Sequence, residues 1–82
     1  MKLNKETKSA AAAYILGLSP QAKVQGTKSE IHAFTEVLKS SRALYTTLND
    51  KTASVKAISE ALAVKSTSAK QFAEVFGHSW PF

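Results

Sequence analysis

The sequence predicts an all-α protein, a compact bundle of four to five short helices. Apolar residues recur at three-to-four spacing over most of the chain, which is the period of a helix buried on one face. No segment shows the alternation of apolar and polar residues that is typical of a half-buried strand, and no internal repeat is present. The 82 residues suit a single domain, 1–82, in which we expect residues 1–7 to be flexible.

The first helix is expected over residues 8–18, where a run of alanines has high helix propensity. Tyr14 and Leu18 are four residues apart and therefore lie on the same apolar face of this helix. Pro20 ends the helix, because proline disfavours a helical conformation at the residue before it. Residues 20–26 are therefore predicted to form a loop.

The second helix, over about residues 28–48, is the one that the sequence predicts most clearly. Thr27 and Glu30 have the spacing of a capping box, in which the hydroxyl and the carboxylate each accept a backbone amide. Residues 40–42, Ser-Ser-Arg, form the weak point where this helix is expected to bend or break. The residues predicted to be buried are Ile31, Phe34, Val37, Leu38, Leu44, Tyr45 and Leu48.

A turn is predicted at residues 49–54, followed by a third helix over 54–63 and a fourth over 67–76. Gly77 is expected to end the fourth helix in a left-handed conformation. The aromatic tail after it is expected to fold back onto the bundle. The residues predicted to be buried in these two helices are Val55, Ile58, Leu62, Ala69, Phe72, Val75 and Phe76.

The composition narrows the classes of function. The chain has no cysteine, hence no disulfide and no thiolate nucleophile, which fits a cytoplasmic protein. The longest apolar-leaning run, residues 9–22, has an apolar centre shorter than the roughly 20 residues that cross a bilayer, so no membrane partner is expected. The formal net charge of +5 favours anionic partners, although scattered lysines equally serve solubility.

Catalysis is not expected. His32 and His78 lack metal-ligand spacing and have no cluster of carboxylates near them in the sequence, so no metal site is predicted. The many serines and threonines have no base and orienting group that would make one of them a nucleophile. The three glycines are isolated, so no phosphate-binding loop and no cofactor is predicted.

Residues 58–77, ISEALAVKSTSAKQFAEVFG, have the pattern of two helices joined by a tight turn. A helix-turn-helix needs small residues at the turn and apolar anchors on both helices. This stretch resembles the helix-turn-helix superfamily of transcription regulators. The residues that carry the pattern are Ile58, Ser59, Leu62, Ala63, Val64, Ala69 and Phe72.

The resemblance implies that the second helix of the motif enters the major groove of double-stranded DNA. The primary prediction is therefore a small non-catalytic DNA-binding protein of the transcription-regulation type, similar to phage or plasmid regulators. The Gln71 side chain can form two hydrogen bonds with adenine, and lysine side chains can bind guanine or phosphate. The predicted DNA contacts are Lys56, Lys65, Ser66, Thr67, Ser68, Lys70 and Gln71.

A second resemblance covers more of the chain. The segments KSAAAAY (8–14), FTEVLKSSRALYTTLND (34–50), SVKAISEAL (54–62) and AKQFAEVFG (69–77) are similar to the N-terminal domain of the ATP synthase delta subunit and its mitochondrial counterpart. That family implies a helical bundle that grips N-terminal segments of the catalytic head's alpha subunits. The chain departs from the family's motifs at Ser9 and Asp50.

Two alternatives to DNA binding therefore stay open: a helical protein-interaction module of this kind, or a small modulator of another protein. A homodimer is a further possible assembly. The angle between the two last helices discriminates between the hypotheses. Near-perpendicular helices favour DNA binding, whereas near-antiparallel helices with an apolar groove favour a protein partner.

Overall fold

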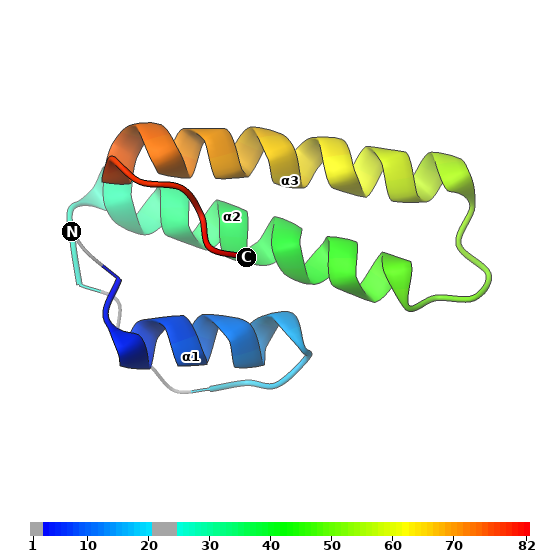
Figure 1. Ribbon diagram of the computed structural model, residues 1–82, viewed down its shortest axis with the longest axis horizontal. Helices are drawn as coiled ribbons and strands as arrows, with labels where there is room; N and C mark the ends of the chain where they lie inside the picture. Colours follow the sequence, from blue (N-terminus) through cyan, green and yellow to red (C-terminus); the bar gives the residue numbers. More distant parts are fainter. Residues whose placement is uncertain (1–2, 21–24) are drawn as a thin grey trace.

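A computed structural model of the protein describes residues 3–20 and 25–82. The described residues form three helices and no strand: α1 (Lys5–Ile15), α2 (Lys28–Leu48) and α3 (Val55–Phe76). In Figure 1, α2 and α3 form a long antiparallel hairpin, and the short α1 lies along one half of it. The predicted all-α class is confirmed, but three helices stand where four to five were expected.

Helix α1 begins earlier than the sequence indicated. Asn4 caps it, because its side-chain carbonyl accepts the Thr7 amide N–H at 2.7 Å. Leu3 and Thr7 are both buried, and residues 5–7 already belong to the helix. The helix ends at Ile15, and Gly17 turns the chain away with a φ of +96°. Of the predicted loop at 20–26, residues 21–24 lie outside the described residues.

Helix α2 begins at the predicted capping box. The Thr27 amide donates to Glu30 Oε1 at 2.8 Å, and Thr27 Oγ1 accepts the Glu30 amide at 3.2 Å. The bond from the Thr27 amide is the main cause that lowers the pKa of Glu30 to about 2. The helix runs unbroken through the expected weak point at residues 40–42, where the Ser40 hydroxyl donates to the Val37 carbonyl at 3.1 Å.

The turn between α2 and α3 follows the predicted chemistry. The Asp50 carboxylate accepts the Thr52 hydroxyl at 2.7 Å and the Thr52 amide at 2.9 Å, and these bonds lower the pKa of Asp50. The Ser54 hydroxyl caps α3 by accepting the Ala57 amide at 3.1 Å. At the other end of α3, Gly77 adopts the predicted left-handed conformation, with a φ of +78°.

The predicted break between residues 63 and 67 is wrong, because α3 is continuous from Val55 to Phe76. This stretch contains neither glycine nor proline, so no residue in it forces the chain out of the helix. The Thr67 hydroxyl also finds its partner inside the helix, where it donates to the Ala63 carbonyl at 3.1 Å. The two helices of the expected motif are therefore successive parts of one helix and do not cross.

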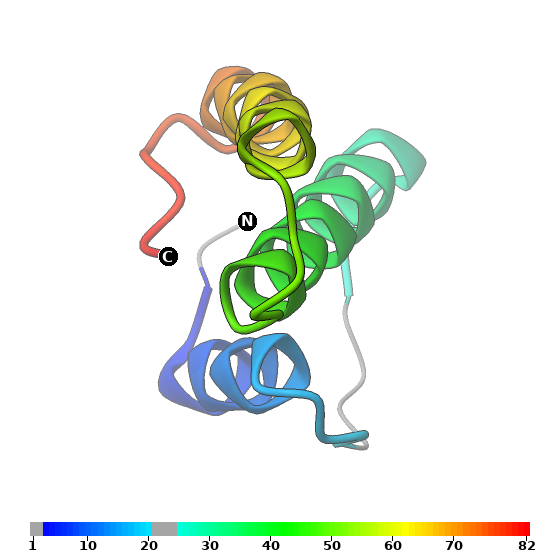
Figure 2. The same cartoon turned by 90° about the vertical axis from the view of Figure 1, so that its right-hand side faces the viewer.

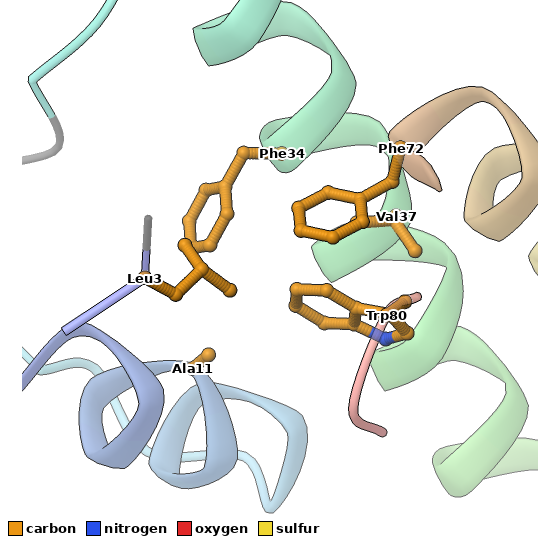
Figure 3. Close-up of a cluster of buried hydrophobic side chains, with 6 residues drawn as sticks. All are labelled: Leu3, Ala11, Phe34, Val37, Phe72 and Trp80. Carbon is orange, nitrogen blue, oxygen red and sulfur yellow. The ribbon is translucent and has the colours of Figure 1, made fainter. Parts of the chain in front are cut away.

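The hydrophobic core joins all three helices and the C-terminal tail (Figure 3). Trp80 lies in this core, edge-on to Phe34 and Phe72, as the expected folding back of the tail requires. The Trp80 indole N–H donates to Ser41 Oγ at 3.0 Å, which satisfies its one buried polar group. The buried apolar residues of this cluster are Leu3, Ala11, Phe34, Val37, Phe72 and Trp80.

Candidate functional site

The two ends of the α2–α3 hairpin have different surroundings. We call residues 28–41 and 66–76 the proximal half of the hairpin, and residues 42–48 and 55–65 the distal half, which meets the connecting turn. In Figure 1, α1 and the C-terminal tail lie along the hairpin but do not extend to its turn end. Figure 2, which looks along the hairpin from that end, shows α1 beside α2 and the tail running from α3 towards α1. The core cluster contains proximal residues of the hairpin and none from its distal half.

On α2, side chains that are covered in the proximal half have exposed equivalents in the distal half. Residues seven apart lie on nearly the same face of a helix, because seven residues make about two turns. Phe34 and Ser41 are buried, yet Leu48, the next in this series, is 59% exposed. Leu38 packs against the core, yet Tyr45, seven residues later, is 41% exposed. The core-facing side of α2 therefore continues beyond the groups that cover it.

The same change from covered to exposed apolar side chains occurs along α3. Phe76 and Ala69 pack against the core. Seven and fourteen residues before Ala69, on the same face, Leu62 is 50% exposed and Val55 is 81% exposed. The predicted burial of Tyr45, Leu48, Leu62 and Val55 is therefore wrong, and all four belong to the distal half. Exposed apolar side chains gathered in this way mark interaction surfaces more often than isolated ones do. The predicted burial of Ile31 and Val75 in the proximal half is also wrong, because both are exposed, at 38% and 42%.

A hollow of about 170 Å³ lies where the distal half meets the end of α1 and the tail. We call it the distal groove. Four parts of the chain line it, namely the end of α1, α2, α3 and the C-terminal tail, and its walls are mainly aliphatic and aromatic. The residues that line it are Ile15, Ser41, Leu44, Tyr45, Leu48, Lys65 and Phe82.

Lys65 is the one charged side chain in the distal groove. It stands midway between Ile58 and Phe72 at seven-residue spacing, on the face of α3 whose other members are partly or fully buried. Lys65 is half-buried and lines the groove, and lysine stems commonly pack along apolar surfaces in this way. No ion pair or hydrogen bond joins its ammonium group to any other residue in the described part of the chain.

The predicted DNA contacts do not share one surface. Ser68 is buried and Lys65 lines the distal groove, so neither belongs to the outer face of α3. The remaining five predicted contacts are exposed along α3: Lys56, Ser66, Thr67, Lys70 and Gln71. Helical spacing puts Glu60 and Glu74 on this outer face as well, where they balance the charges of Lys56 and Lys70.

The histidines show no metal-binding arrangement. His32 is exposed on α2, and the His78 ring lies edge-on to Phe72 and Phe76, with its Nδ1 3.1 Å from the Ser79 carbonyl oxygen. Among residues 3–20 and 25–82, no group of three or more His, Cys, Asp or Glu side chains is placed to hold a metal ion.

Comparison with protein-family models, curated proteins and solved structures finds no match to this chain. Within the described part of the chain, every helix is too short or too polar to cross a membrane.

The distal groove was missed from the sequence, although one signal for it is present. The seven-residue series Ile58, Lys65, Phe72 places Lys65 on the buried face of a continuous helix. A predicted turn at this point assigned Lys65 to an outward surface instead.

Proposed function

We propose that the protein is a non-catalytic helical interaction module, which binds an amphipathic helix of another protein in the distal groove. The observation that carries this proposal is the change along the hairpin from buried to exposed apolar side chains at constant helical register. Leu48 and Tyr45 occupy the positions that Phe34 and Leu38 occupy in the proximal half, but α1 and the tail do not cover them.

A helix is the element that suits this surface. In the proximal half, α1 packs on the hairpin as a third layer, and it has 11 residues where α2 has 21 and α3 has 22. A partner helix placed beyond α1 would extend that layer. In helix-in-groove recognition, an amphipathic helix places apolar anchors at i, i+3 or i+4, and i+7 in a hydrophobic groove. Leu44 and Leu48, four residues apart on one face of α2, contribute to the apolar wall that would receive such anchors.

Burial of the exposed apolar surface supplies the driving force for such binding. Each square ångström of apolar surface removed from water contributes about 25 cal/mol. Tyr45 adds a large and rather rigid ring, and tyrosine is among the residues enriched at the energetic centres of interfaces. The resemblance to the delta-subunit domain implies a partner of the same class, a helical segment of another protein.

A displayed library of 16-residue amphipathic peptides tests the proposal on the intact protein. Leucines are held at helical spacing, and all other positions are randomised. Enriched peptides are then measured against wild type, Leu48→Glu and Val64→Glu. We expect Leu48→Glu to weaken binding by at least tenfold, because it places a carboxylate on the groove wall.

Val64→Glu is the matched control. Val64 is 59% exposed, as is Leu48, but it lies two residues from Leu62 and hence on another side of α3. It should leave the affinity unchanged. The proposal fails if no peptide is enriched above background, or if the enriched peptides bind Leu48→Glu as tightly as wild type. Circular dichroism of both variants checks that the helices are retained.

DNA binding by the outer face of α3 is the second candidate. The formal net charge of +5 favours it, as does the exposure of Lys70 and Gln71. Because α3 is one continuous helix, such binding would use its exposed side rather than the N-terminus of a separate recognition helix. The nearby Glu60 and Glu74 oppose a phosphate backbone, which is why the groove is preferred.

Titration of the protein with labelled duplex DNA at increasing salt tests this candidate. Binding through phosphates gives an affinity that falls linearly on a log–log plot against salt. Absence of binding at about 50 mM salt would exclude DNA binding. If binding occurs, Lys70→Ala and Gln71→Ala should weaken it, whereas Leu48→Glu should not.

A further inference from the structure

We infer that the helix bound in the distal groove carries an acidic residue that pairs with Lys65, so that the partner is an acidic amphipathic segment. This inference rests on the proposed function and specifies the chemistry of its ligand. Its physical basis is the position of Lys65, which lines a groove whose other side chains are uncharged.

No side chain that lines the groove is a counter-ion for Lys65. Its other six lining side chains are apolar or hydroxyl-bearing. A helix that covered the groove would remove water from the ammonium group, and an unpaired charge taken out of water is costly. A carboxylate on the covering helix removes this cost and adds a charge-assisted hydrogen bond.

The charged residues around the groove also favour a partner with negative charge. Between residues 42 and 65 the chain has four basic and two acidic residues, a formal balance of +2. Of the acidic residues, Asp50 is engaged with Thr52, and Glu60 lies on the outer face of α3. Of the basic residues, the Arg42 guanidinium lies over the Tyr14 ring, 4.5 Å from its centroid. Lys65 is therefore the cation with a direct place in the groove.

A second copy of the chain fits this surface poorly. In a two-fold symmetric dimer the same patch meets itself, so each Lys65 would be covered by the partner's groove, which has no acidic side chain in its lining. Each chain also carries a formal charge of +5. Like charges juxtaposed in an interface oppose association. An acidic segment of a different protein avoids both penalties.

Peptide selection against variants of Lys65 tests the inference. The library described above is selected in parallel against wild type, Lys65→Gln and Lys65→Glu. We expect wild type to enrich Asp or Glu at one fixed position relative to the leucines. Lys65→Gln should lose this preference, and Lys65→Glu should replace it with Lys or Arg. Lys56→Glu, on the outer face of α3, should retain the wild-type preference.

Affinity measurements separate the charge of Lys65 from its packing. A peptide selected on wild type should bind Lys65→Met about tenfold more weakly, because the methionine keeps the apolar stem but removes the ammonium group. Replacing the peptide's acidic residue with glutamine should weaken wild type by a similar factor and Lys65→Met very little. Such non-additivity identifies a direct pair. Equal affinity of the acidic peptide for wild type and Lys65→Met would overturn the inference.

The outcomes also distinguish this inference from the proposed function. Peptides that depend on Leu48 but show no acidic preference leave the groove as a binding site and refute the role of Lys65. A lack of any peptide dependent on Leu48 refutes both. Sedimentation equilibrium should show a monomer, and a dimer abolished by Leu48→Glu would replace the acidic partner with a second copy. Thermal unfolding of each variant confirms that it is folded.

Discussion

The proximal and distal halves of the α2–α3 hairpin are built from the same kinds of residues at the same spacing, yet only the proximal half is covered. Ala69 packs against the core, whereas Leu62, seven residues earlier on the same face of α3, is 50% exposed. The difference comes from the third layer, because α1 and the tail cover only part of the hairpin's length. Stability should therefore depend on the proximal half, and binding on the distal half.

The largest expected effect is at the centre of the proximal half. Phe72→Ala should destabilise the protein by about 3–5 kcal/mol, because it removes a fully buried ring that contacts Phe76, His78 and Trp80. Urea unfolding followed by circular dichroism measures this loss. Leu62→Ala is the distal counterpart and should cost less than about 1 kcal/mol. Comparable losses for the two variants would remove the proposed difference between the halves.

The bond between the tail and α2 comes next. Ser41→Ala should cost about 1–3 kcal/mol, because it leaves the buried Trp80 indole N–H without an acceptor. Chemical unfolding monitored by tryptophan fluorescence follows this contact directly. Ser59→Ala, at an exposed position of α3, provides the control and should change the free energy of unfolding by less than about 0.5 kcal/mol.

The cap at the start of α2 should contribute a smaller amount. Thr27→Ala removes the hydroxyl that accepts the Glu30 amide and should cost about 1 kcal/mol. Thr27→Ser keeps the hydroxyl and should retain most of the stability. Urea midpoints of the two variants can be compared directly. If Thr27→Ser lost as much stability as Thr27→Ala, the threonine methyl group rather than the capping bond would be responsible.

The capping carboxylate should make part of the stability depend on pH. Glu30 has a pKa of about 2 in the folded protein against an ordinary value of 4.5, mainly because the Thr27 amide donates to it. A carboxylate whose pKa is lower in the folded state than in the unfolded state stabilises the protein at pH values above its unfolded-state pKa. This contribution is lost as the pH falls through the folded-state pKa. The Tm of wild type should exceed that of Glu30→Gln above pH 4.5 and converge with it near pH 2. A Tm difference that is constant over this range would contradict the account.

Changes on the distal face should have the smallest effects on stability. Val55→Ser alters a side chain that is 81% exposed and should shift the free energy of unfolding by less than about 0.5 kcal/mol. Leu48→Gln should cost less than about 1 kcal/mol, because its side chain is largely in water already. Urea unfolding measures both. A loss of about 3 kcal/mol at either position would mean that the distal half is packed as the proximal half is.

Much of the fold was predictable from local signals. The capping box at Thr27 and the left-handed Gly77 depend on chemistry within a few residues, and both predictions are confirmed. Phe34 and Phe72 were recognisable as core residues from their spacing. Such features do not require knowledge of how the helices are arranged relative to one another.

The continuity of α3 and the exposure of the distal half were not predicted correctly, for different reasons. Ala63 and Val64 fit the pattern of a helix-turn-helix, but they are also compatible with a helix interior, and no glycine or proline decides for the turn. The spacing of apolar residues identifies the face of α2 on which Leu48 lies and shows that this face would favour burial. The spacing does not indicate whether another element covers that face. That coverage depends on the length of α1 and the path of the tail, which are tertiary features.

Methyl NMR of the intact protein, titrated with a peptide selected on the distal groove, tests the central claim most directly. We expect the methyl resonances of Leu44 and Leu48 to shift with the peptide concentration, together with those of Ile15. The methyls of Val64 on the other side of α3 should remain in place. Shifts at Val64 without shifts at Leu44 and Leu48 would contradict the assignment of the groove as the binding site.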